Sequence, residues 1–75
     1  MKIIKIDDNS YVKEDDDGNK YWYQDNLLHR LDGPAIECYN GNKFWYYEGK
    51  YIKCSSQKEF ERIIKLRLFW QNEDN

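Results

Sequence analysis

The chain contains one seven-residue passage twice. Residues 17–23 read Asp-Gly-Asn-Lys-Tyr-Trp-Tyr, and residues 40–46 read Asn-Gly-Asn-Lys-Phe-Trp-Tyr. The two glycines, Gly18 and Gly41, lie 23 residues apart, and every other equivalent pair keeps this offset. A fixed period of this length indicates one supersecondary unit that is used twice. This repeat constrains the fold more than any other feature of the sequence.

The turn signals show what the repeated unit is. Asp-Gly or Asn-Gly precedes each aromatic run, and Asp25-Asn26 and Glu48-Gly49 follow the two runs at equivalent positions. Such pairs between extended apolar runs favour tight hairpins because both residues accept positive φ. Each copy therefore predicts strand, turn, strand, turn and strand. The expected strands are residues 3–6, 10–14, 20–24, 27–29, 34–39, 42–47 and 50–53.

A helix is expected after the last strand. Ser56 and Glu59 have the spacing of a capping box, in which the serine hydroxyl accepts the Glu59 N–H while the carboxylate reaches back. The apolar residues that follow recur at helical spacing and form one stripe: Phe60, Ile63, Ile64 and Leu68. We expect this helix to span residues 55–70 and the polar tail, residues 71–75, to fray.

These elements predict one small α+β domain. Residues 1–16 form N-terminal strands, and residues 17–53 form two hairpin repeats of 23 residues each. The expected architecture is an antiparallel β-meander of about six or seven short strands, with the C-terminal helix packed on one face of the sheet. A chain of 75 residues has room for a single core.

Strand alternation assigns the side chains to two faces. Tyr21 and Tyr23 share one face, and Trp22 lies on the other. The second copy repeats the pattern, with Phe44 and Tyr46 on one face and Trp45 and Tyr47 on the other. Both faces therefore carry rings, and the helix is expected to cover one of them.

The charge distribution excludes one class of partner. The net charge is −2, but residues 1–37 carry five basic and nine acidic side chains, whereas residues 38–75 carry seven basic and five acidic ones. Such an asymmetry favours head-to-tail contact or a charged partner. It is too weak to predict binding to duplex DNA.

The cysteines and the first residues indicate a cytoplasmic protein. Cys38 and Cys54 lack the spacing of a metal or redox motif, so two reduced thiols are expected, with a Cys38–Cys54 disulfide as the alternative. The first residues lack the apolar core of a signal peptide. No apolar run reaches the length of a membrane span, so no membrane partner is expected.

The only histidine does not form a recognisable catalytic set. His29 lies in Leu-His-Arg-Leu-Asp-Gly-Pro-Ala, residues 28–35, and the serines of the chain lie in turn or cap contexts. A general base needs an orienting group and a nucleophile. We therefore interpret this passage as a structural turn, in which His29 and Arg30 are tied to neighbouring carbonyls or to Asp32. No catalytic residue, metal site or cofactor is expected, and the acidic turn at residues 15–19 lacks the pattern of a calcium loop.

One arrangement suggests a nucleotide ligand. Lys20 and Lys43 stand two residues before Trp22 and Trp45, and a ring that stacks on a base beside a lysine that meets phosphate is a common nucleotide-binding arrangement. The alternative is that both lysines are solvated strand positions that protect the sheet. The two readings stay open.

Residues 17–53 carry the string Gly-x-x-x-Trp-Tyr…Leu-His-Arg-x-Asp-Gly-Pro-Ala…Asn-Gly-x-x-x-Trp-Tyr…Gly-Lys. This string resembles a repeat in small proteins of tailed phages and giant viruses, and more distantly the MORN-type β-hairpin repeat. The second copy departs from the pattern at residues 51–54, and the Gly-x-Gly ending of MORN repeats is absent, which argues against lipid binding. The resemblance implies an accessory, non-enzymatic protein without catalytic residues.

The expected function is therefore a phage-type accessory protein that binds and inhibits a host protein in the host cytoplasm, as an anti-CRISPR-like counter-defence inhibitor does. The alternative is an oligomeric sponge that sequesters a nucleotide or cyclic nucleotide. The excess of apolar residues at the end of the helix also fits a homodimer. Because hot spots favour Trp, Tyr and Arg, the predicted partner-binding residues are Tyr21, Trp22, Arg30, Trp45, Tyr47, Arg67, Phe69 and Trp70.

Overall fold

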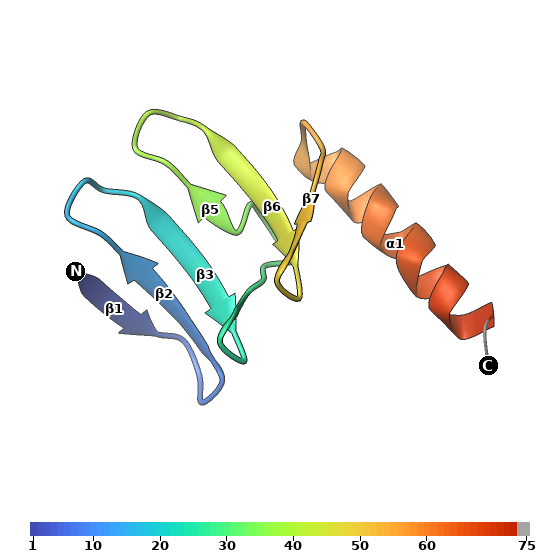
Figure 1. Cartoon of the computed structure of the whole chain (residues 1–75), viewed down its shortest axis with the longest axis horizontal. Helices are drawn as coiled ribbons and strands as arrows, with labels where there is room; N and C mark the ends of the chain where they lie inside the picture. The colour runs from blue at the N-terminus through green and yellow to red at the C-terminus, as the bar shows by residue number, and fades with distance from the viewer. Residues whose placement is uncertain (74–75) are drawn as a thin grey trace.

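The protein folds into an antiparallel sheet followed by one helix (Figure 1). A computed structural model describes the backbone of residues 1–73 and the side chains of residues 1–69. The strands run in the order β1-β2-β3-β5-β6-β7, and β4 pairs with β3 off this path. The elements are β1 (Lys2–Lys5), β2 (Ser10–Glu14), β3 (Lys20–Gln24), β4 (Leu27–Leu28), β5 (Ile36–Glu37), β6 (Lys43–Tyr47), β7 (Lys50–Ile52) and α1 (Gln57–Glu73).

The expected α+β meander with a C-terminal helix is confirmed. The helix is longer than the sequence suggested, since it runs through Glu73 and includes the first part of the tail that was expected to fray. Its first turn has the predicted cap, because Ser56 Oγ accepts the Glu59 N–H at 3.2 Å. The reciprocal bond differs by one residue: Glu59 Oε1 accepts the N–H of Ser55, also at 3.2 Å.

The two copies share the backbone geometry of their first turns. The Gly18 N–H donates to the Asp15 carbonyl at 3.2 Å, and the Gly41 N–H donates to the Cys38 carbonyl at 2.9 Å. Both glycines lie in the left-handed region, with φ of 91° and 94°, which an L side chain rarely adopts. In each pair only the glycine has positive φ. These turns therefore differ from the two-residue hairpin, with positive φ at both positions, that the Asn-Gly signal favours.

That two-residue geometry occurs at the second turn of each copy. Asp25 and Asn26 have φ of 53° and 65°, and Glu48 and Gly49 have φ of 49° and 83°. Positive φ at both central residues matches the right-handed twist of the strands on either side. The repeat in the sequence is thus a repeat of two different turns, each conserved in geometry between the copies.

The sheet has one apolar row that runs across its strands. The register aligns Ile4, Val12 and Trp22 across β1, β2 and β3, and aligns Trp45 with Ile52 across β6 and β7. Because Tyr21 and Phe44 both pair with Ile36, the tryptophans that follow them share the opposite face. We call this side of the sheet the helix face.

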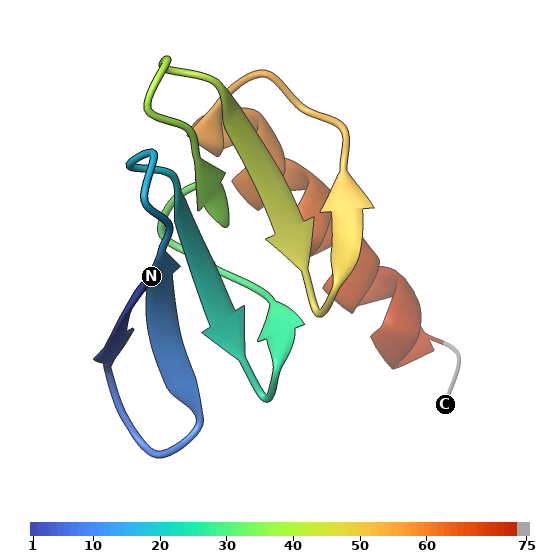
Figure 2. The same ribbon diagram turned by 60° about the vertical axis from the view of Figure 1, so that its left-hand side comes forward.

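The helix packs at only one end of the helix face. The core cluster joins Trp45 and Ile52 of the sheet to Phe60 and Ile64 of α1, and Phe60 is 1% exposed. Figure 2 shows α1 behind β6 and β7, while β1, β2 and β3 lie away from it. The hydrophobic core therefore occupies the second repeat, and the first repeat needs another way to cover Trp22.

Candidate binding surface

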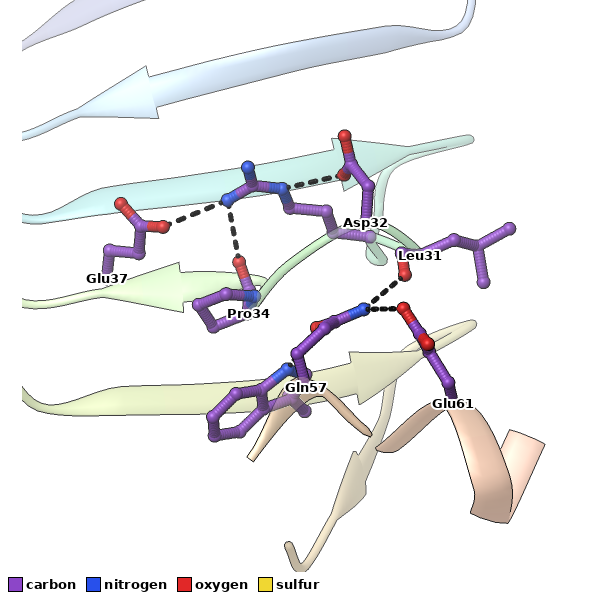
Figure 3. Close-up of polar contacts among 8 residues, drawn as sticks. Leu31, Asp32, Pro34, Glu37, Gln57 and Glu61 are labelled. Carbon is purple, nitrogen blue, oxygen red and sulfur yellow. Dashed lines mark hydrogen bonds and ion pairs between the residues drawn. The ribbon is translucent and has the colours of Figure 1, made fainter. Parts of the chain in front are cut away.

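Arg30 covers Trp22 in place of the helix. Its guanidinium carbon lies 3.9 Å from the centroid of the Trp22 ring. The same side chain donates from Nε to Asp32 at 2.9 Å, and from Nη1 to Glu37 at 3.1 Å and to the Pro34 carbonyl at 3.2 Å (Figure 3). The predicted link between Arg30 and Asp32 is confirmed. With 20% of its side chain exposed, Arg30 is committed to contacts inside the molecule.

The neighbours of Arg30 are also used for folding. A Cβ on Gly33 would lie 2.7 Å from Arg30 Cζ, so only glycine leaves room for the guanidinium. Ala35 is fully buried. His29 Nδ1 accepts the Glu48 N–H at 2.9 Å, which ties the first repeat to the last turn of the second. The His-Arg-x-Asp-Gly-Pro-Ala part of this passage, residues 29–35, is therefore a linker that joins the two copies.

Trp45 belongs to the core and is not an exposed anchor. Its side chain is 6% exposed, and its indole N–H donates to Gln57 Oε1 at 2.8 Å. Gln57 then donates from Nε2 to the Leu31 carbonyl at 2.8 Å and to Glu61 at 2.9 Å, as Figure 3 shows. Gln57 joins the sheet, the linker and the helix, and nothing in its local sequence marks it for this role.

The other predicted residues are spread over the molecule. Tyr21 is half-buried, and its hydroxyl donates to Asp15 Oδ2 at 3.0 Å. Tyr47 is half-buried on the helix face, where it packs against the core. Arg67 and Phe69 are exposed on α1, with Phe69 60% exposed. The side chain of Trp70 lies outside the described residues. The seven predicted residues whose side chains the structure describes thus do not form one surface.

The structure limits the arrangement considered for a nucleotide. Trp45 is buried, and one side of the Trp22 ring is occupied by the Arg30 guanidinium. A base would have to displace that guanidinium, and with it three hydrogen bonds, to stack there. Lys20 and Lys43 are exposed strand positions.

The opposite side of the sheet carries six rings. Tyr11 stacks on Tyr23 with the ring centroids 5.1 Å apart, and Tyr51 contacts Tyr46 at 5.6 Å and Phe44 at 6.4 Å. The helix packs on the other face, so α1 does not cover these rings. We call this side the ring face. Its strand positions are Ile3, Lys5, Tyr11, Lys13, Tyr21, Tyr23, Leu28, Ile36, Phe44, Tyr46 and Tyr51.

The ring face combines partly buried and exposed rings. Tyr51 is 52% exposed and Phe44 is 36% exposed, whereas the other four rings are half-buried by their neighbours. Only Tyr21 among these rings was predicted as a partner-binding residue. Strand alternation groups Tyr21 with Tyr23, and Phe44 with Tyr46. The pairing of both Tyr21 and Phe44 with Ile36 places the two groups on one face.

The polar groups at the edge of the ring face are internally satisfied. Asp15 accepts hydrogen bonds from the side chain and the N–H of Asn19, from the Tyr21 hydroxyl and from the Asp17 N–H. These bonds, those from Asn19 above all, hold the pKa of Asp15 below its ordinary value. The same contact with Asp15 raises the pKa of Tyr21. Asp15 and Tyr21 thus lock the first turn to β3.

The two cysteines are free. Cys54 packs against the core, and burial raises the pKa of its thiol, with a smaller contribution from the charge of Glu59. Among the residues that the structure describes, no helix has the length and the apolar character to cross a bilayer.

Comparisons with protein-family models, with curated proteins and with solved structures found no significant match to this chain.

Proposed function

We propose that the protein is a small non-enzymatic binding module that engages another protein through its ring face. One observation carries this proposal: six aromatic rings lie on a sheet face that α1 leaves uncovered. A sheet with apolar side chains on both sides normally packs a second layer on each. Tyrosine is enriched where proteins meet, because its ring offers a large contact and a polar tip at low entropic cost.

The shape of the molecule supports the same function. The Cα extents are 43 × 29 × 15 Å, so the protein is a thin plate in which the sheet and α1 lie side by side (Figure 1). The ring pairs are held in place by stacking and by the sheet register, so a partner would meet a largely preformed surface. Preorganisation of this kind lowers the entropic cost of binding.

The resemblance to small phage accessory proteins adds the class of partner to the proposal. The partner is a host protein, and the module acts as its inhibitor in a counter-defence role. Two observations favour protein binding over a nucleotide sponge: Arg30 already occupies one side of the Trp22 ring, and Trp45 lies in the core.

The experiment compares two double variants. Phe44→Ser with Tyr51→Ser alters the exposed part of the ring face, and Leu66→Ser with Phe69→Ser makes a matched change on the exposed side of α1, where these residues are 55% and 60% exposed. Proteins captured from host lysate by the wild type are identified by mass spectrometry, purified and titrated against all three proteins by calorimetry. Circular dichroism checks that each variant is folded.

We expect the ring-face variant to bind the captured partner about 30-fold or more weakly, since two ring anchors contribute about 1–2 kcal/mol each. The helix variant should bind within about threefold of the wild type. Full binding by the ring-face variant would contradict the proposed surface. The capture is repeated with the ring-face variant. If no host protein is retained more strongly by the wild type than by this variant, the proposed function itself is contradicted.

A further inference from the structure

The ring face carries charge of one sign. Its charged strand positions are Lys5 on β1 and Lys13 on β2, and none of its strand positions is Asp or Glu. Lys5 pairs with Tyr11, two residues from Lys13 on β2, so the two lysines are diagonal neighbours on this face. Lys13 Nζ lies 5.7 Å from the centroid of Tyr23, which stacks on Tyr11. Two cations therefore stand beside two stacked rings, on a chain whose net charge is −2.

In the part of the chain whose side chains are described, residues 1–69, no Asp or Glu stands at a strand position of the ring face. Many of the acidic side chains lie in the turns at the two ends of the strands, namely Asp7, Asp8, Asp16, Asp17, Asp25 and Glu48. The carboxylate of Asp15 reaches the edge of the ring face, but it already accepts four hydrogen bonds. An anionic ligand would thus be attracted to Lys5, at the end of β1, and to Lys13, near the end of β2, and repelled at the turns.

This pattern limits the size and shape of a complementary ligand. A long polyanion, such as a single-stranded nucleic acid, carries a charge at every residue and would meet the acidic turns as well as the lysines. A protein segment can place one or two carboxylates beside Lys5 and Lys13 and apolar side chains elsewhere. The remaining rings, Phe44, Tyr46 and Tyr51, offer it an uncharged surface on β6 and β7.

We propose that the ring face docks an apolar protein segment that carries carboxylates, with its Asp or Glu residues at Lys5 and Lys13 and its apolar residues on the rings of β6 and β7. The inference rests on the proposed function for the choice of surface. It adds the chemistry of the partner: an acidic and apolar segment, in contrast to a basic or purely apolar one.

A displayed library of random peptides tests this without knowledge of the partner. Peptides on yeast are selected for binding to the labelled wild type at low salt, with counter-selection against the Phe44→Ser/Tyr51→Ser variant so that only ring-face binders remain. We expect the enriched peptides to contain more Asp and Glu than the input library. Their affinity should fall as salt is added, because exposed ion pairs are screened.

Two charge variants then locate the carboxylates. Lys5→Gln with Lys13→Gln removes the lysines of the ring face, and Lys20→Gln with Lys43→Gln removes two exposed strand lysines of the helix face as a matched control. We expect the first variant to bind the enriched peptides about tenfold more weakly, as for two partly exposed ion pairs. The control should bind them within about twofold of the wild type.

Three outcomes overturn the inference. The first is enrichment of neutral or basic peptides, and the second is an equal loss of affinity in both lysine variants. The third is tighter binding of a fluorescent oligothymidine than of the enriched peptides, lost with Lys5→Gln/Lys13→Gln. In the first and second outcomes the ring face still binds proteins. A library with no peptide enriched over the ring-face variant instead contradicts the proposed function.

Discussion

The two equivalent tryptophans should differ greatly in their contribution to stability. Trp45 is 6% exposed and contacts the helix core, whereas Trp22 is half-buried under the Arg30 side chain. Replacing a buried aromatic residue with alanine costs about 3–5 kcal/mol. A domain of 75 residues has a total stability of roughly 4–11 kcal/mol, at about 0.05–0.15 kcal/mol per residue. Trp45→Ala should therefore remove from about a quarter to all of the stability of the domain.

Trp22→Ala should cost less, about 1.5–3 kcal/mol, because the lost contact is half-exposed and Arg30 keeps its three hydrogen bonds. Urea titrations followed by far-UV circular dichroism give the free energy of unfolding of both variants without relying on tryptophan fluorescence. Trp45→Phe keeps an aromatic ring but removes the indole N–H and part of the buried ring volume. It leaves Gln57 Oε1 without the indole N–H and should cost about 1–3 kcal/mol.

The order of these effects is the test. If Trp22→Ala destabilised the protein as much as Trp45→Ala, the core would not be confined to the second repeat, and the assignment of Arg30 as a cover for Trp22 would be wrong. If Trp45→Ala kept full stability, Trp45 would not be the centre of the core.

Three further results are expected. Gly33→Ala should displace Arg30 and lower the urea midpoint, whereas the midpoint should stay unchanged if Arg30 contributes nothing to stability. Folding lowers the pKa of Asp15, so the ionised carboxylate stabilises the folded protein. This contribution to stability is present above the ordinary aspartate pKa of about 4 and is lost as the pH falls through the lower folded pKa. The Asp15→Asn variant should therefore lose less unfolding free energy than the wild type when the pH is lowered below about 4. An equal loss in both proteins would refute this. With Cys38→Ser in place, Cys54 should react with Ellman's reagent more slowly than a free cysteine peptide at pH 8, since burial raises its pKa; an equal rate would contradict that burial.

Local signals in the sequence were sufficient for the elements of this fold. Glycines at turn positions, strand alternation and the Ser56–Glu59 cap depend on a few neighbouring residues, and the structure has turns, strands and a cap at these places. The turns at Gly18 and Gly41 differ in type from the predicted two-residue hairpin, and the helix ends later than expected. The environment of the tryptophans was different. Trp22 and Trp45 have nearly identical local sequences, so only the segment that follows each copy decides which of them is buried.

The candidate surface shows the same division between local and distant information. Within each strand the membership of the ring face follows from alternation, so the grouping of Tyr21 with Tyr23 and of Phe44 with Tyr46 was within reach of the sequence. The sequence does not predict which face of the sheet stays uncovered, because this depends on where α1 packs. Gln57 was missed for a similar reason, since its partners Trp45 and Leu31 lie 12 and 26 residues away.

One pair of substitutions between the copies becomes intelligible only in three dimensions. Asp15 and Tyr21 of the first copy correspond to Cys38 and Phe44 of the second. The hydroxyl and the carboxylate that bond each other in the first turn are thus both absent from the second. Tyr39 compensates in part, because its N–H donates to Asn19 Oδ1 at 2.9 Å and fastens the second turn to the first.

The linker at residues 29–35 also shows how strands are added to this sheet and where the sheet ends. After the first copy this segment carries its own cover for Trp22 and returns the chain to the sheet as β5. At the equivalent point of the second copy, residues 52–58, the chain leaves the sheet and begins α1. A chain with a third copy would therefore need the Arg30 type of linker after its first two copies and the helix only after its last. The number of strands in this architecture therefore depends on the segment that follows each copy: a linker like residues 29–35 adds further strands, and a helix like α1 ends the sheet.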